Sequence, residues 1–450
     1  MVDSTLVNAA KSILQHNFKC KKGENVVALC DNHNICDAIS EGAKSLSLFP
    51  DTIYIPPSQR PLEKVSKGLE EILKTADIIM TPMERRDGEF IYRRRVRNIV
   101  MGKGKARIGT MVGMREDIFS HKAVFKKPKD MKVLSYSLAE ILTKGNELRI
   151  YTDIGTDIKF ILGRWNRTAE PSIAELYTRR TIGNIPSGES YISPIENSAN
   201  GKIVIDGSIP QYPPLSESGE LVTLYVENGV VNKIEGDKAA NILRDRLNQV
   251  GTSFNQYPME NLRTIGEIGI GLNDFAEIIG IPIMDEKVYG TAHVALGDNT
   301  LLGGENKAPI HQDLVMVEPT ILIDDVEILS KKKFNKKVIK ELCEEDYKDI
   351  DIGDFSTSNI VNIRKKFQGV EKKNGKLYRR YKSPSGSIRL TQVGDSYTAN
   401  IALKICEYLE SCGENNCENI SDVLKMDLNE ITQVLFVMCK YNLLKLKNNP

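Results

Sequence analysis

The stretch from Ala292 to Asp313, which reads AHVALGDNTLLGGENKAPIHQD, gathers three side chains of the types that bind metal ions. The chain has only five histidines, and two of them, His293 and His311, fall here. Asp313 follows His311 at a spacing of two residues. In an extended strand, side chains two positions apart share a face, so His311 and Asp313 can point at one ion. The stretch therefore predicts a metal site.

Three glutamates could complete such a site, because dinuclear hydrolytic centres need carboxylates that bridge two ions and share their charge. Glu189 ends NIPSGE, a Pro-Gly turn that would present its carboxylate at a strand end. Glu267 lies in GEIGIGLN, where an acidic group is costly to bury unless it is paired or bound to metal. Glu286 lies in MDEKVYG, seven residues before His293, and a solvated surface position among its charged neighbours explains it equally well.

Two regions of regular structure are expected to position these side chains. From residue 1 to about 145, helix-like segments alternate with β-branched runs such as NVVALC, DTIYIP and ADIIMTP. This alternation predicts βαβ units and a parallel sheet with helices on its faces. From about 146 to 330, Gly, Pro and Asn separate strand-like runs, VENGVVNKI carries an Asn-Gly hairpin signal, and Lys238 to Gln249 reads as a helix. We expect an α/β protein with an N-terminal α/β domain at 1–145 and a mixed α+β, metal-binding catalytic domain at 146–330.

A third domain is expected at 331–450. The basic run SKKKFNKKVIK begins at Ser330 and is typical of a boundary segment. Residues 361–389 hold ten Lys or Arg against one Glu. A helix is expected over Ala399 to Glu410, and the segment after it has the helix, turn, helix and strand pattern of a small winged-helix-like module, ending in LLKLK.

Composition places the chain among soluble proteins. Charged residues make up 27% and hydrophobic residues 41%, and the formal net charge is +1, which argues neither for nor against nucleic acid. The N-terminus lacks the features of a secretory signal, and no apolar run approaches the roughly 18 residues that suggest a membrane helix. We expect a cytoplasmic protein that does not bind a membrane.

Four motifs together resemble a known family. NIPSGE, the glutamate of IGEIGIG, the DE that precedes GTAHVALG, and the closing HQD occur in the order found in the thermophilic metallo-aminopeptidases typified by aminopeptidases T and S. The architecture of residues 20 to 325 is similar to that family, while the specific motifs lie between 184 and 313. The shorter gap between the two histidines looks like that of the archaeal and bacterial relatives described as leucyl aminopeptidases.

The resemblance implies a dinuclear exopeptidase that releases N-terminal residues from peptides. Its two divalent ions would be zinc, cobalt or manganese, and a metal-activated water would attack the scissile carbonyl while one ion anchors the α-amine of the peptide. The counterpart of Glu267 bridges the ions in family members, and a homodimer is implied. By position, the expected metal ligands are Glu189, Glu267, Glu286, His293, His311 and Asp313, and the expected catalytic carboxylates are Glu267 and Glu286.

One position departs from the family. Family enzymes carry a tyrosine seven residues after the first histidine, where this chain has Thr300, which is too short to reach the same point. Tyr289 is the candidate replacement. The loss leaves open whether a phenol can stabilise the transition state of peptide hydrolysis.

Two alternatives therefore remain beside the aminopeptidase. A dihydroxypyridine ring-opening dioxygenase of the same superfamily holds one Fe(II) through two histidines and an aspartate, and His293, His311 and Asp313 alone would satisfy that set. The glutamates favour the hydrolase, because they have a role in a dinuclear centre and none in a mononuclear one. The number of bound ions separates these two readings.

The other alternative is a catalytically inactive, peptidase-like binding protein whose C-terminal module recognises a ligand. A winged helix with a basic approach could hold nucleic acid through phosphates. Such modules also bind leader or carrier peptides along a sheet edge, and beside an aminopeptidase domain we prefer this peptide partner. A module that serves only oligomerisation or stability explains the segment as well.

Overall fold

The computed structural model describes most of the chain and forms two compact units, residues 1–344 and 345–450. In the part of the chain that is described, no helix is both long enough and apolar enough to cross a membrane. The described residues are 2–343 apart from 87–88, 164–166, 178 and 180, and in the second unit 360–363, 370–373, 376–382, 388–392, 396–412, 414–426, 431, 434–435, 438 and 444–447.

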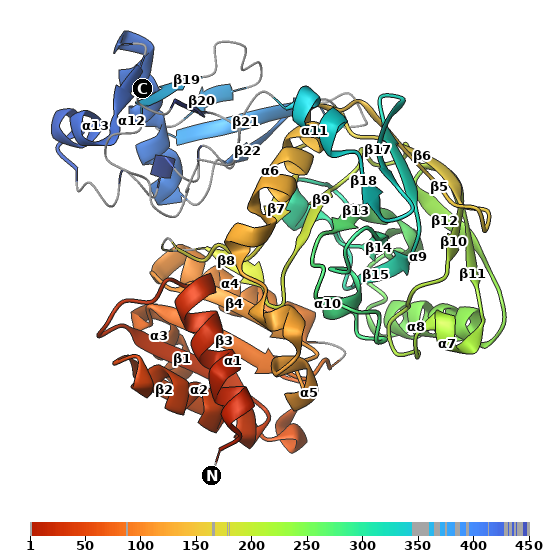
Figure 1. Cartoon of the computed structure of the whole chain (residues 1–450), viewed down its shortest axis with the longest axis horizontal. Coiled ribbons are helices and arrows are strands. Elements are labelled where there is room, and N and C mark those ends of the chain that lie inside the picture. The colour runs from red at the N-terminus through yellow and green to blue at the C-terminus, as the bar shows by residue number, and fades with distance from the viewer. Residues whose placement is uncertain are drawn as a thin grey trace. The chain divides into compact units, whose positions relative to one another are not determined.

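A five-stranded parallel sheet, in the order β2-β1-β3-β4-β8, opens the first unit. Alternate side chains of β1 enter different cores: Val26 and Ala28 pack with α1 and α2, whereas Val27 and Leu29 pack with α3 and α4. The predicted parallel sheet with helices on its faces is therefore confirmed (Figure 1). The elements are α1 (Ser4–Ser12), β1 (Asn25–Cys30), α2 (His33–Ser45), β2 (Phe49–Tyr54), α3 (Lys67–Thr75), β3 (Ile78–Met83), α4 (Phe90–Lys103), β4 (Arg107–Val112), α5 (Glu116–Phe119) and β8 (Ile182–Asn184).

Two antiparallel sheets follow and share one hydrophobic core with the helices α6 and α8. The larger has eight strands in the order β12-β11-β10-β6-β5-β16-β17-β18, and the smaller, the site sheet, has the order β15-β14-β13-β9-β7. The elements are α6 (Pro128–Lys144), β5 (Glu147–Tyr151), β6 (Asp157–Ile161), β7 (Glu170–Ser172), β9 (Glu189–Ile192), β10 (Asn200–Ile205), α7 (Leu215–Ser218), β11 (Val222–Glu227), β12 (Val230–Glu235), α8 (Lys238–Ser253), α9 (Met259–Arg263), β13 (Ile265–Gly271), α10 (Pro282–Asp285), β14 (Ala292–Gly297), β15 (His311–Met316), β16 (Thr320–Ile323), β17 (Val326–Ser330), β18 (Lys333–Phe334) and α11 (Lys336–Leu342).

The expected hairpin and helix of this region are both present. β11 and β12 pair antiparallel across Asn228 and Gly229, whose φ angles are 49° and 77°. Two successive positive φ angles are what a type I′ turn requires, and Asn-Gly adopts them at little steric cost. The helix expected at Lys238 to Gln249 corresponds to α8.

A four-residue connection joins the parallel sheet to the site sheet. β8 is the edge strand of the parallel sheet and ends at Asn184, whereas β9 of the site sheet begins at Glu189. The connection is anchored at both ends, because the Ile185 amide donates to the Thr110 carbonyl at 2.9 Å and the Gly188 amide donates to the Ser172 carbonyl at 3.0 Å. Glu189, the first predicted ligand in the sequence, is therefore positioned by the connection between the parallel sheet and the site sheet.

The boundary of the second unit lies further along the chain than expected. Residues 331–343, which the sequence places in the C-terminal domain, belong to the first unit, because β18 pairs with β17 and α11 packs against α6. The division at residue 145 remains a prediction. In the second unit the described elements are β19 (Ile360–Ile363), β20 (Val370–Lys373), β21 (Lys376–Lys382), β22 (Ile388–Gln392), α12 (Ser396–Cys412), β23 (Glu414–Asn416), α13 (Cys417–Leu424) and β24 (Leu444–Lys447).

Two small antiparallel sheets, β23-β19-β24 and β20-β21-β22, accompany the helices of the second unit. The helix expected at 399–410 lies within α12. Much of the following segment, 427–443, lies outside the described residues, so the winged-helix-like assignment and its peptide or nucleic-acid partners remain predictions. The homodimer likewise remains a prediction.

A buried ion-pair cluster at the carboxyl end of the parallel sheet yields a test of stability. The Arg60 side chain is fully buried and pairs with Asp31 and Glu89, and its Nε donates to Glu89 Oε1 at 2.8 Å. Arg60→Ala should lower the free energy of unfolding by about 3–5 kcal/mol, because it leaves two buried carboxylates without their cation. Lys74→Ala, which breaks solvent-screened pairs with Glu70 and Glu71, should change it far less. Equal effects of the two substitutions in urea denaturation would contradict this account.

Candidate metal centre

The predicted ligands line one face of the site sheet. Glu189 begins β9, Glu267 lies on β13, His293 on β14, and His311 and Asp313 on β15. The antiparallel register brings them together, since Ala295 of β14 pairs with Glu267 on one side and with Asp313 on the other. Gln312, between the two β15 ligands, points to the opposite face, where Arg246 Nε of α8 donates to its Oε1 at 2.6 Å.

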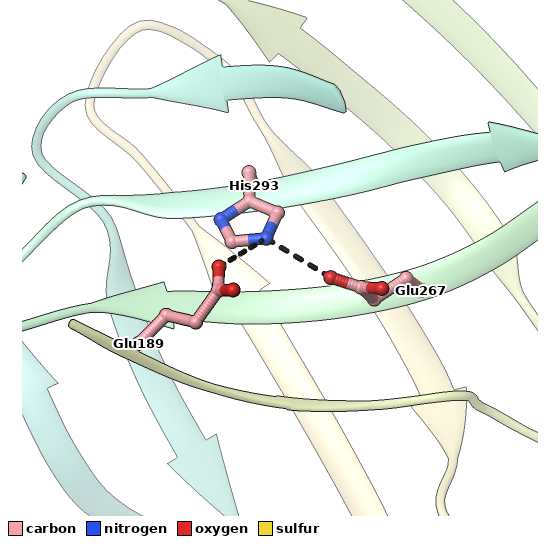
Figure 2. Close-up of side chains that lie close together, drawn as sticks. All are labelled: Glu189, Glu267 and His293. Carbon is pink, nitrogen blue, oxygen red and sulfur yellow. Dashed lines mark hydrogen bonds and ion pairs between the residues drawn. The ribbon is translucent and has the colours of Figure 1, made fainter. Parts of the chain in front are cut away.

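The donor atoms of these side chains are close enough to share metal ions. His293 Nε2 lies 3.2 Å from Glu267 Oε1 and 3.4 Å from Glu189 Oε2, as Figure 2 shows. His311 Nε2 lies 3.4 Å from Glu267 Oε2 and 3.4 Å from Asp313 Oδ1. The Glu267 carboxylate therefore lies between the two imidazoles, with one oxygen facing each.

Glu286 reaches the same centre from the turn that follows α10. One of its oxygens, one nitrogen of His293 and one oxygen of Asp313 lie within 4.8 Å of one another. Two further groups of three, Glu189–Glu267–His293 and Glu267–His311–Asp313, meet the same limit. The structure thus brings together all six predicted ligands, whose binding of metal remains a prediction.

Access to the centre differs from one side to the other. The His293 side chain is fully buried and that of Glu189 is 3% exposed, whereas His311 is 24% and Asp313 13% exposed. A ligand therefore has access to the centre along β15.

Gly269 provides the space that the His293 imidazole occupies. Gly269 of β13 pairs with His293 of β14, and a Cβ atom built on Gly269 would lie 2.2 Å from both Cε1 and Nε2 of the imidazole. No side chain other than hydrogen fits at that distance. The glycines of IGEIGIG are thus part of the centre, because one of them lets a histidine lie against the strand.

The hydrogen bonds of the centre leave room for a cation. His311 Nδ1 lies 2.9 Å from the Asp298 carbonyl oxygen, which can only accept, so Nδ1 donates and Nε2, which faces the carboxylates, is the nitrogen left to bind a metal ion. Among the described residues, Glu189 Oε2 and His293 Nδ1 are buried without a hydrogen-bond partner. An orphaned carboxylate oxygen beside an imidazole fits a bound metal ion.

The negative charge of the clustered carboxylates also favours a bound cation. Burial raises the pKa of Glu286 well above its usual range, and the charge of Asp313 raises it further. Burial lowers the pKa of His311, but Asp313 and Glu267 outweigh burial and hold that pKa well above the ordinary value. The pKa of His293 is raised in the same way, mainly by its hydrogen bond to Glu267. Without metal, these carboxylates attract protons to the imidazoles.

Sequence reasoning missed Lys287, which is fully buried beside the centre. Its Nζ donates to Glu189 Oε1 at 2.5 Å and also to Glu286 Oε1. In MDEKVYG the sequence gives equal weight to a solvated position and to metal binding for Glu286, and it assigns no role to Lys287.

The two positions considered for the missing family tyrosine have other roles. Thr300 donates to Asp298 Oδ1 at 2.7 Å and accepts from Arg94 Nη2 at 3.2 Å. Tyr289 packs edge-on against Phe334, with ring centroids 5.0 Å apart.

A different tyrosine, Tyr191, lies on β9 two residues after Glu189, so both side chains are on the site face of the sheet. Burial raises its pKa well above the usual value, and nearby carboxylates, Glu170 and Glu267 among them, raise it further, so the phenol stays neutral. The spacing of two from Glu189 could have identified Tyr191 in the sequence.

Comparison with known proteins identifies the family. A family model described as NicX, 2,5-dihydroxypyridine 5,6-dioxygenase, matches residues 56–336, more than half of the 450-residue chain, and this range contains the whole centre. The chain belongs to the 2,5-dihydroxypyridine 5,6-dioxygenase family. The 2,5-dihydroxypyridine 5,6-dioxygenase of Pseudomonas putida KT2440 is 28% identical over 194 residues, a match that covers 41% of this chain and 53% of that protein, about half its length.

Two solved structures share the fold. The 2,5-dihydroxypyridine dioxygenase from Pseudomonas putida KT2440 aligns with a TM-score of 0.57 at 21% identity, over 74% of this chain and 98% of its own. Wild-type AmpT from Thermus thermophilus aligns with a TM-score of 0.50 at 14% identity, over 74% of this chain and 99% of its own. The α/β fold class and its likeness to the peptidases are thereby confirmed, and at these identities the likeness concerns the fold alone.

The family corrects the expected function. The aminopeptidase prediction, with its hydrolase chemistry, is wrong: the family match and the curated relative name a dioxygenase, the alternative reading. The four motifs contain carboxylates and an imidazole that the fold of this chain brings together, and that fold is shared by the dioxygenase and AmpT structures, so motif order did not separate the two reactions. Dioxygenase chemistry implies a metal, and the donor set described above fits one.

Replacing Gly269 tests how the centre is built. Gly269→Ala should weaken metal binding by about 10–100-fold, the range found when the support of a metal ligand is removed, because the new methyl group displaces the His293 ring. Isothermal titration with a divalent metal measures the change. Gly68→Ala is the control, since a Cβ there has no neighbour within 4 Å and α3 should gain or keep stability. Unchanged affinity in Gly269→Ala would show that His293 does not bind the metal.

Metal affinity should also depend on pH. Because neighbouring carboxylates raise the pKa values of His293 and His311 in the metal-free centre, protons compete with a metal ion for both imidazoles. Apparent affinity should therefore rise as pH rises from about 6 to about 8, with protons released on binding. Competition with a chelator at several pH values measures it. A flat profile, with no proton release in calorimetry, contradicts metal binding through these two histidines.

Proposed function

We propose that the chain is a mononuclear non-haem Fe(II) dioxygenase that opens the ring of a hydroxylated pyridine or a similar aromatic ring. The observation that carries the proposal is the donor set on β14 and β15: two histidines and one aspartate, His293, His311 and Asp313, inside the range matched by the dioxygenase family. A set of two histidines and one carboxylate is typical of non-haem Fe(II) oxygenases, because it leaves positions open for substrate and oxygen.

The distances are compatible with one ion among these three residues. Asp313 Oδ1 lies 3.4 Å from His311 Nε2, and Asp313 and His293 offer donor atoms within 4.8 Å of each other. Donor atoms that each lie about 2.0–2.2 Å from one ion are separated by roughly 3–4 Å, so modest side-chain movements suffice. The bound iron would supply the redox chemistry that lets oxygen react with an aromatic ring.

The chain's own residues would position the substrate. A flat ring would enter beside His311 and Asp313, the partly exposed ligands. The Glu267 carboxylate, which faces both imidazoles, would take the proton that a ring hydroxyl loses on binding. The hydrogen bond from His311 Nδ1 to the Asp298 carbonyl would keep its Nε2 directed at the ion.

The test starts from full-length protein loaded with Fe(II) under anaerobic conditions. Addition of 2,5-dihydroxypyridine and oxygen should consume one oxygen molecule per ring and remove the aromatic absorbance. His311→Ala and Asp313→Asn should lower the rate by more than about 100-fold, which exceeds the effect of changing residues that only support a metal ligand. His33 is an exposed histidine of the parallel sheet region, and His33→Ala should leave the rate unchanged.

A spectroscopic measurement makes the test independent of the exact substrate. Nitric oxide, which binds iron in place of oxygen, should give the spin-3/2 resonance of a mononuclear iron site in the wild type and lose it in Asp313→Asn. Full activity in His311→Ala, or hydrolysis of free-amine peptides at the rate of a peptidase, would overturn the proposal.

A further inference from the structure

The centre contains more carboxylates than one divalent ion requires. Glu189, Glu267, Glu286 and Asp313 all offer oxygens to it, together with two imidazoles. The three possible donor groups overlap, since Glu267 belongs to two of them and so do His293 and Asp313. Such an arrangement holds enough donors for two neighbouring ions, and carboxylates that bridge two ions are the hallmark of dinuclear centres.

Two of these carboxylates are already engaged by a cation of the protein itself. Lys287 is fully buried, and its ammonium bonds to Glu189 Oε1 at 2.5 Å and to Glu286 Oε1. An ammonium is taken into a protein interior at a high cost in solvation unless such partners surround it. The pair of glutamates therefore stabilises the buried lysine, and the lysine neutralises the pair.

The backbone holds Lys287 firmly in this position. Its amide donates to the Met284 carbonyl at 3.1 Å, and its carbonyl accepts from the Asn273 amide at 2.8 Å. The Asn273 side chain in turn donates to the Ser187 carbonyl at 2.9 Å, next to the segment that enters Glu189. The ammonium and its first carboxylate partner are thus tied to the same network.

We infer that Lys287 limits the centre to a single divalent ion by holding one oxygen of Glu189 and one of Glu286 and neutralising part of their charge. This inference rests on the mononuclear function proposed above and adds the residue that sets the metal number. With four carboxylates, the ammonium and one divalent ion leave one negative charge, whereas a second divalent ion would make the centre positive. Lys287 is a positioning residue, because it acts through the two glutamates.

The metal content of Lys287 variants tests this inference. Full-length wild type, loaded with Mn(II) alone and freed of excess metal, should hold one equivalent by elemental analysis. Lys287→Met keeps much of the side-chain length but removes the charge, and should hold two equivalents. Its electron paramagnetic resonance should show coupling between neighbouring Mn(II) ions, which a purely structural role of Lys287 would not produce. Lys287→Arg keeps the charge and should hold one.

Two further variants keep the test decisive. Lys287→Asn repeats it with a smaller polar side chain, in case Lys287→Met does not fold. Lys144→Met is the matched control, because it removes a lysine paired with the buried Glu140 on α6, and should hold one equivalent. Circular dichroism and thermal unfolding establish that each variant is folded.

The outcomes separate this inference from the proposed function. One equivalent of Mn(II) per chain in the wild type and two in the folded, uncharged Lys287 variants support the inference. One equivalent, or none, in those variants overturns the role of Lys287 and leaves the mononuclear function intact. Two equivalents in the wild type overturn the mononuclear function itself.

Discussion

The crowding of like charges on one face of the site sheet is the constraint on which the rest of the centre depends. Four carboxylates converge where water is largely excluded, and none can stay ionised there without positive charge nearby. Lys287 supplies part of that charge, the imidazoles supply more when protonated, and a metal ion replaces those protons. The centre therefore favours a bound cation, and we propose that the positive charge of Lys287 determines how many divalent ions it holds.

The fold alone does not determine which reaction such a centre catalyses. The same arrangement of sheets accommodates both the dioxygenase from Pseudomonas putida and AmpT, at sequence identities that carry no information about chemistry. Function depends on the side chains of the site, and we propose that a charged side chain next to the ligands is one that separates such proteins. In this chain that side chain is Lys287, which lies one position after a predicted ligand.

Much of the fold and the centre could be predicted from local patterns. Runs such as NVVALC and the Asn-Gly turn specify strands and a hairpin through side-chain shape and allowed φ angles, which act over a few residues. The spacing of His311 and Asp313 likewise placed both on one face of a strand. The pairing of Lys287 with Glu189 could not be predicted, because it joins residues 98 positions apart and depends on burial. The reaction was mispredicted because histidines and carboxylates in this order suit both a dinuclear hydrolase and a mononuclear dioxygenase.

The short connection between the two sheets makes the centre sensitive to mechanical change within the first unit. Only residues 185–188 separate the edge strand of the parallel sheet from Glu189, and hydrogen bonds fix them at both ends. A rotation of one sheet against the other must be absorbed by those four residues or be transmitted to the Glu189 carboxylate. Because that carboxylate is paired with Lys287 and lies 3.4 Å from His293 Nε2, such a rotation would alter the electrostatic field at the candidate metal position.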